Sequence, residues 1–149
     1  MRAVAQRVSS CSITVGDECV SDMQEGLLAL IGAARGDKPE DAVQLATKLV
    51  HLRVFPDPEG RMNRSLLETG GTLCIVSQFT LLGDCRKGRR PSYADAAPPE
   101  EAEQLIELLV AEAGSLGVPT VTGRFRASMR VNLCNEGPVT LLLDTRRNF

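Results

Sequence analysis

The stretch that most constrains the fold is Gly26 to Ala33, which is apolar at nearly every position. This pattern is typical of a strand buried on both faces, because a strand with one face in water alternates apolar and polar side chains. The chain has 149 residues, which gives room for one real core and little for a second. We therefore predict a single domain that spans residues 1–149.

The other segments alternate between β and helical patterns. Residues 3–15 and the turn at 16–18 predict a β-hairpin, and further strands are expected at 72–76, 129–134 and 139–144. Helical spacing predicts one helix from residue 37 or 38 to about Arg53, and a second that opens at Pro98-Pro99 and ends at Gly114 and Gly117. This order predicts an α/β fold, a β-rich layered sandwich (β/β/α) of antiparallel and mixed sheets covered by two helices. Self-association would cover the sheet edges.

The composition excludes some modes of binding. Aromatic residues make up only 3% of the chain and tryptophan is absent, which argues against a stacking platform for nucleic-acid bases. The net charge of −2 excludes a protein that is basic all over, yet one basic cluster falls within five positions: Arg86, Lys87, Arg89 and Arg90. That cluster is either a solvated surface run or a phosphate-binding edge.

Metal and histidine chemistry find little support. The five cysteines are odd in number and lack Cys-x-x-Cys spacing, so they indicate neither a disulfide framework nor a zinc site. The lone histidine, His51, lies in the first predicted helix without a nucleophile motif, and we interpret it as a helix-surface residue. We predict no metal and no cofactor. The chain also lacks a secretory signal and a membrane-spanning run, so we expect a cytoplasmic location without membrane contact.

Two short segments are candidates for a site. Residues 77–80, Ser-Gln-Phe-Thr, are polar at the end of a predicted buried strand, where chains often present functional groups. They form either a ligand site with main-chain N–H groups or a turn satisfied by its own hydroxyls. Gly137-Pro138 interrupts a β pattern, and it is either a tight hairpin turn or a recognition element built from main-chain atoms.

Taken together, these motifs resemble the D-aminoacyl-tRNA deacylases. The matching segments are Ser77-Gln78-Phe79-Thr80-Leu81, the stretch from Lys87 to Tyr93, and Asn135-Glu136-Gly137-Pro138-Val139-Thr140. The start from Met1 to Val8, Leu52 to Phe55, and Met62-Asn63 match as well, so the resemblance spans the chain in order. The chain departs from the family at Glu136, where aspartate is usual, and at Arg126, where a small residue is usual.

The resemblance implies a homodimeric hydrolase that acts on the 3′ end of aminoacyl-tRNA, with its active sites at the subunit interface. It would release D-amino acids, and also glycine mischarged on tRNA(Ala). A cis Gly137-Pro138 of one subunit would point its carbonyls into the site that holds Ser77, Gln78, Phe79 and Thr80 of the other, leaving no room for an L side chain. Arg7 and Met129 would support this motif. Arg86, Lys87, Arg89 and Arg90 would contact tRNA.

For the cleavage step, the resemblance implies that the main-chain N–H groups of Phe79 and Thr80 polarise the ester carbonyl. The 2′-hydroxyl of the terminal adenosine would help to activate water. A competing mechanism makes Thr80 a covalent nucleophile, which needs a base that the sequence does not reveal.

Two other classes of protein remain open. A non-catalytic RNA-binding protein would hold tRNA through the basic cluster and leave the ester intact. An amidase or esterase for small metabolites would use Ser77 or Thr80 as its nucleophile and would not need the basic cluster.

Overall fold

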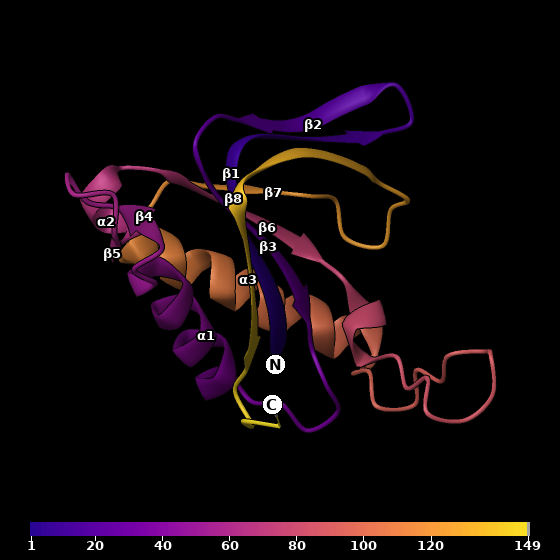
Figure 1. Cartoon of the computed structure of the whole chain (residues 1–149). Coiled ribbons are helices and arrows are strands. Elements are labelled where there is room, and N and C mark those ends of the chain that lie inside the picture. The colour runs from indigo at the N-terminus through magenta and orange to yellow at the C-terminus, as the bar shows by residue number, and fades with distance from the viewer. Residues whose placement is uncertain (149) are drawn as a thin grey trace.

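One mixed sheet of six strands organises the fold in the computed structural model, which describes residues 1–148. Its strands are β1 (Arg2–Val15), β2 (Glu18–Met23), β3 (Gly26–Gly32), β6 (Thr72–Ser77), β7 (Thr120–Thr122) and β8 (Arg130–Asp144). Strand β1 pairs antiparallel with β2, β3 and β8, whereas β3, β6 and β7 are parallel. The sheet is therefore mixed, as the sequence predicts, and the domain is of the α/β class (Figure 1).

Two long helices, α1 (Pro39–His51) and α3 (Pro99–Ser115), cover one face of this sheet (Figure 1). Each has proline in its first turn, where the missing N–H costs nothing, followed by acidic residues that suit the positive end of a helix. Both predicted helices are confirmed to within a few residues. Five short elements were not predicted: β4 (Phe55–Pro56), β5 (Met62–Arg64), α2 (Leu66–Thr69), the 3₁₀ turn η1 (Phe79–Leu82) and strand β7.

Strand β3 is buried on both faces, as its composition predicts. Leu27, Ala29 and Ile31 pack in the larger cluster, which α1 and α3 complete. Leu28 faces the other way, into a smaller cluster with Cys74 of β6 and Ile13 of β1. The second half of β1, together with β2, thus covers the face opposite the helices, and the layers follow the predicted β/β/α order.

Strand β8 is an edge strand that pairs with β1 along almost its whole length. The register shifts twice, between Gln6 and Val8 and between Val8 and Ser10. The first shift is the larger: Gln6 faces Thr140 but Val8 faces Asn135, so residues 136–139 form a bulge. Gly137-Pro138 lies in this bulge and its peptide bond is cis. The hairpin-turn interpretation is therefore wrong: one strand continues through the dipeptide. A β pattern broken by Gly-Pro does not reveal whether the chain turns or bulges.

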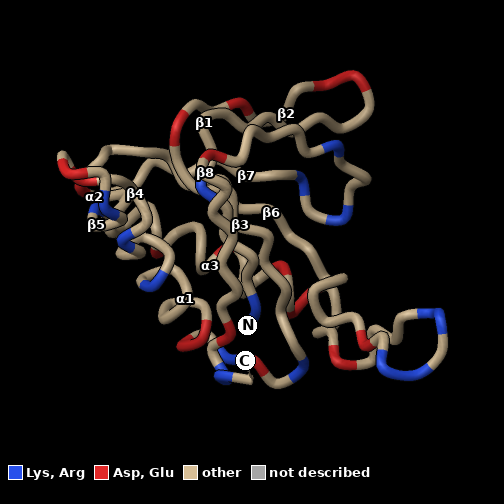
Figure 2. The backbone as a smooth tube through the Cα atoms, viewed as in Figure 1, with Lys and Arg blue, Asp and Glu red and all other residues tan. Residues whose placement is uncertain are grey.

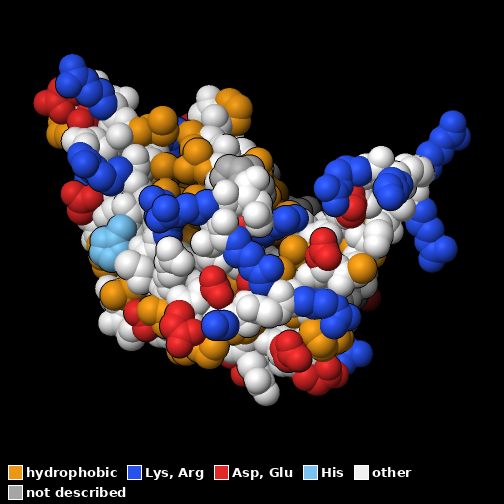
Figure 3. Space-filling view, turned by 90° about the horizontal axis from the view of Figure 1, so that it is seen from below, with side chains coloured by type: hydrophobic (Ala, Val, Ile, Leu, Met, Phe, Trp, Pro, Cys, Tyr) orange, Lys and Arg blue, Asp and Glu red, His pale blue; other side chains and the backbone are white. Residues whose placement is uncertain are grey.

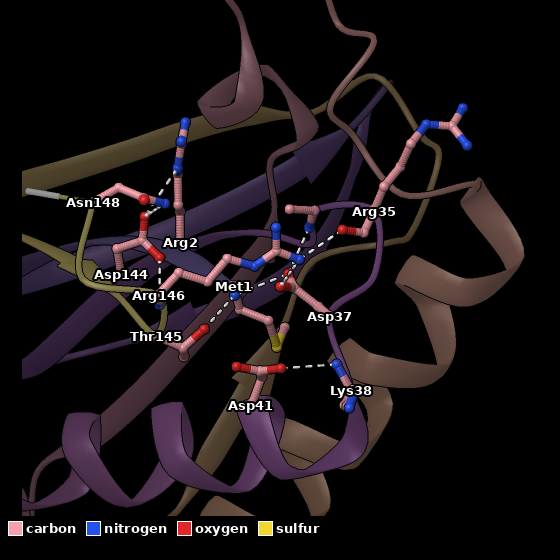
Figure 4. A network of polar contacts seen from close by, with 11 residues as sticks. Met1, Arg2, Arg35, Asp37, Lys38, Asp41, Asp144, Thr145, Arg146 and Asn148 are labelled. Carbon is pink, nitrogen blue, oxygen red and sulfur yellow. Dashed lines mark hydrogen bonds and ion pairs between the residues drawn. The ribbon is translucent and has the colours of Figure 1, made fainter.

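A buried polar network joins three parts of the chain near the two termini (Figure 4). The Met1 α-ammonium lies 2.9 Å from an oxygen of Asp37, with both groups fully buried. Arg146 reaches the other Asp37 oxygen at 2.7 Å, and the ammonium donates to the Thr145 hydroxyl at 2.6 Å. The loop after β3 is thereby tied to β1 and to the segment that follows β8.

Candidate active site

A cavity of about 550 Å³ opens at the end of strand β6. The last residues of β3 and β6 meet at this cavity because the two strands are parallel, with Ile31 opposite Ser77. Ser77, Gln78 and Phe79 form one wall. The sequence therefore placed these three residues at the correct end of a buried strand.

The turn after β6 is held by main-chain hydrogen bonds. The Gln78 N–H donates to the Ile31 carbonyl at 2.7 Å, which extends the sheet, and the Leu81 N–H donates to the Gln78 carbonyl at 3.2 Å. Phe79 and Thr80 open the turn, so their N–H groups have no acceptor within it. The Gln78 side-chain amide donates to the Thr80 hydroxyl oxygen. Thr80 is exposed and does not line the cavity itself.

The opposite walls come from α3 and from the loop that follows β7. Pro99, Ala102 and Ile106 lie on one face of the helix, three and four positions apart. The loop contributes a group of lining residues, which are Phe125, Arg126, Ala127 and Met129. Pro99, Ala102 and Ile106 were not predicted at the site, because small and apolar residues at helical spacing look the same in any core.

The loop wall contains Arg126, one of the two positions at which the sequence departs from the family that it resembles. Arg126 has a φ of +61°, a left-handed conformation that suits glycine or asparagine better than arginine. Its guanidinium lies 3.8 Å from the Glu100 carboxylate, at the first turn of α3. Among the residues that line the cavity, Arg126 is the charged one, so the wall offers no carboxylate or imidazole as a general base.

Gly137 and Pro138 do not line this cavity, and neither does Arg7. The Arg7 guanidinium instead holds the bulge of β8: its Nε donates to the Glu136 carbonyl at 3.0 Å and Nη1 to the Val54 carbonyl at 2.5 Å. Asn135 accepts a hydrogen bond from the Val139 N–H at 2.8 Å. Within one chain, the two predicted halves of the site are therefore separate.

The basic cluster sits on a hairpin that follows η1 in the chain and projects from the body of the molecule (Figure 2). Its stem is closed by two hydrogen bonds between the main chains of Asp84 and Ser92, at 2.8 and 2.9 Å. Arg86 turns back to Asp84, with contacts of 2.9 and 2.8 Å, and these hydrogen bonds lower the pKa of the Asp84 carboxyl to about 2. Lys87, Arg89 and Arg90 are exposed.

Other expected features can also be located. His51 ends α1 on the surface, and its Nδ1 lies 2.8 Å from the Thr47 carbonyl, so it is a helix-surface residue as interpreted. In residues 1–148, no three His, Cys, Asp or Glu side chains gather as they would around a metal ion. All five cysteines are free thiols. None of the described helices has the length and apolar character needed to span a bilayer.

Comparison with known proteins identifies the family. Residues 4–144 match the family model described as D-Tyr-tRNA(Tyr) deacylase. A D-aminoacyl-tRNA deacylase from Desulforudis audaxviator is 54% identical over 100% of both chains. One from Roseiflexus sp. is 57% identical over 97% of this chain and 94% of its own. The chain belongs to the D-Tyr-tRNA(Tyr) deacylase family, which confirms the resemblance and places the chain among hydrolases.

Solved structures agree with the fold. A structure titled c-Myc DNA Unwinding Element Binding Protein superposes with a TM-score of 0.92 at 34% identity, covering 97% of this chain and 99% of the other. A structure described as a probable eukaryotic D-amino acid tRNA deacylase superposes with a TM-score of 0.78 at 18% identity, covering 95% and 97%. The second comparison supports the architecture alone.

Proposed function

We propose that this chain hydrolyses the ester bond of D-aminoacyl-tRNA and releases the D-amino acid and free tRNA. The observation that carries the proposal is 54% identity over the full length of a D-aminoacyl-tRNA deacylase. The cavity at the end of β6 suits this substrate, because a largely apolar pocket with a few polar groups can hold a terminal nucleoside and its ester. The reaction takes place in the cytoplasm, where aminoacyl-tRNA is made and used.

The main chain of the turn supplies the stabilising groups for cleavage. The N–H groups of Phe79 and Thr80 have no acceptor within η1, so they can donate to the oxyanion that forms when water attacks the ester. The walls of the cavity hold no carboxylate or imidazole, and the substrate's own 2′-hydroxyl therefore helps to activate the water. Thr80 acts through its N–H group, and its hydroxyl accepts a hydrogen bond from Gln78.

A second copy of the chain discriminates between D- and L-aminoacyl groups. In the homodimer, the carbonyls of Gly137 and Pro138 from one copy enter the cavity of the other, accept hydrogen bonds from the substrate's α-ammonium and exclude an L side chain. Arg7 supports the proposal because it fixes the carbonyl just before this dipeptide. Strand β8 also exposes Leu133 and Leu142, apolar side chains that a second chain would cover. Glycine has no side chain to exclude, so glycyl-tRNA(Ala) is a substrate too.

The test compares the decay of D-Tyr-tRNA, L-Tyr-tRNA and Gly-tRNA(Ala) with and without the protein. We expect faster decay of the D-tyrosyl and glycyl esters and no change for the L ester. Equal decay of the D and L esters, or no acceleration of either, would overturn the proposal. Salt-sensitive binding of charged tRNA with the ester intact would instead support the non-catalytic RNA-binding alternative. Sedimentation of the protein reports the dimer independently.

A further inference from the structure

Two aromatic side chains lie exposed and in contact with each other. The chain has one tyrosine and four phenylalanines. Phe55 is fully buried, as a large apolar side chain usually is, whereas Phe79 is 56% and Tyr93 40% exposed. Their ring centroids are 5.0 Å apart with an interplanar angle of 67°, an edge-to-face pair. Two of the few aromatic side chains in this protein therefore lie together on its surface.

This aromatic pair, Phe79 with Tyr93, lies between the cavity and the basic hairpin. Phe79 lines the cavity, and Tyr93 directly follows the Asp84–Ser92 stem of the hairpin. The chain after Tyr93 runs along the cavity wall through Ala96 and Ala97. A ligand strand that leaves the cavity toward the hairpin would pass over the two rings.

The segment that carries Tyr93 is fixed to the end of β3. Arg35 donates from its main chain to the Asp95 carbonyl at 2.9 Å, and from Nε to the Ala94 carbonyl at 2.8 Å. The Ala97 N–H donates to the Ala33 carbonyl at 2.9 Å. The Tyr93 ring also packs against Gly83, where an added Cβ would lie 3.0 Å from Cε1. The ring is therefore held in place before any ligand binds, which lowers the entropy cost of stacking on it.

The hairpin beyond the aromatic pair offers positive charge. Arg86 is engaged by Asp84, but Lys87, Arg89 and Arg90 are exposed at the tip. Figure 3 shows Lys and Arg side chains gathered on a projection of the molecule. Aromatic faces followed by cations are the combination that binds single-stranded nucleic acid, with rings under the bases and cations at the phosphates.

We propose that the Phe79–Tyr93 pair is a stacking platform for the nucleobase next to the terminal adenosine of the tRNA, and that the hairpin cations hold the phosphates beyond it. This inference rests on the proposed function and assigns the path of the 3′ strand away from the cavity. It also narrows the expectation, drawn from the low aromatic content, that the chain has no stacking platform for bases. An aromatic content of 3% excludes a platform for many bases, but two exposed rings suffice for one.

The test uses substrates that differ only in whether the upstream nucleotide is present. One is the D-tyrosyl ester of adenosine, and the other is the D-tyrosyl ester of the 3′-terminal cytidine–adenosine dinucleotide. We expect Tyr93→Ser to lower kcat/KM about tenfold for the dinucleotide ester and to leave the adenosine ester within about twofold. Tyr93→Phe keeps the ring and should retain the dinucleotide preference. Leu67→Ser removes a similarly exposed apolar side chain elsewhere and should change neither substrate.

A second measurement addresses the hairpin. Replacing Lys87, Arg89 and Arg90 together by serine should reduce the log–log slope of tRNA binding against salt by about 0.7 for each phosphate that the variant no longer neutralises. Hydrolysis of the adenosine ester should stay unchanged. An unaltered salt slope would overturn the assignment of the cations to the tRNA phosphates.

The stacking proposal and the proposed function fail in different ways. Equal losses on both esters, or no loss on either, would overturn the platform while the wild-type protein remains a deacylase. If the wild-type protein hydrolyses neither ester, the proposed function is decided by D-Tyr-tRNA and fails if the protein leaves that substrate intact as well. The platform is then decided by binding of the non-hydrolysable 3′-amides: Tyr93→Ser must weaken the dinucleotide amide relative to the adenosine amide, and equal affinities would overturn it.

Discussion

The turn at 77–80 and the bulge at 136–139 are fixed in different ways. The turn continues an inner strand and is held by main-chain hydrogen bonds from Gln78 to Ile31 and from Leu81 to Gln78. The bulge interrupts an edge strand and depends on side chains, with Arg7 on the Glu136 carbonyl and Asn135 on the Val139 N–H. A geometry held by the main chain survives side-chain replacement, whereas one held by single side chains does not. Substitutions should therefore harm the bulge more than the turn.

The largest effect is expected from Gly137→Ala. Gly137 has a φ of +128°, and an added Cβ would lie 2.8 Å from Arg7 Nη2 and 3.0 Å from Val139 Cγ2. We expect kcat/KM for D-Tyr-tRNA to fall about 100-fold, because a displacement near 1 Å is enough for such a loss. Gly60→Ala is the matched control, since Gly60 has a φ of +79° with nothing within 4 Å of the added Cβ. Equal activity of the two variants would contradict a role for the bulge.

Arg7→Met should have the next largest effect. It keeps much of the side-chain volume but removes the donors to the Glu136 and Val54 carbonyls. We expect about a tenfold loss of kcat/KM, a lower ratio of D to L hydrolysis, and a loss of about 2 kcal/mol in the free energy of unfolding. Arg61→Met, on an exposed turn, serves as the control. Lower stability with an unchanged D to L ratio would assign Arg7 to folding alone.

Thr80→Val tests the turn and should lower the single-turnover rate of D-Tyr-tRNA hydrolysis by less than about tenfold. The substitution removes the hydroxyl but leaves the N–H group that opens η1. Single-turnover hydrolysis of D-Tyr-tRNA, measured beside tRNA affinity, checks it. Complete loss of turnover with intact tRNA binding would instead favour Thr80 as a covalent nucleophile.

Arg126→Gly should have the smallest effect, and it should stabilise the folded protein. Arg126 adopts a left-handed conformation, which costs an L-residue about 1–2 kcal/mol. Glycine avoids this cost, but it loses more conformational entropy on folding, which offsets part of the gain. We expect the free energy of unfolding to rise by about 0.5–1 kcal/mol. Denaturant titration measures it. A decrease would show that the contact of Arg126 with Glu100 outweighs the backbone strain.

The sequence predicted those parts of the fold that depend on long, regular patterns. The apolar run at 26–33 and the two amphipathic helices have enough residues to show their period, and Ser77, Gln78 and Phe79 could be placed because they end a buried strand. The elements that were missed are two to four residues long and show no period. The continuous strand through Gly137-Pro138 was not predicted. Its bulge depends on pairing with β1, which is distant in sequence, and a local pattern does not reveal such pairing.

The pairing of β1 with β8 has a consequence for the order of folding. Arg2 and Asp144 hydrogen bond across 142 positions of sequence, so the sheet cannot gain its edge strand until nearly the whole chain has been synthesised. Contacts this distant slow folding, because the loop between them must close first. The parallel pair β3–β6 and the turn at 77–80 can form earlier. A nascent chain would thus hold the wall of its cavity before it acquires the Gly-Pro bulge.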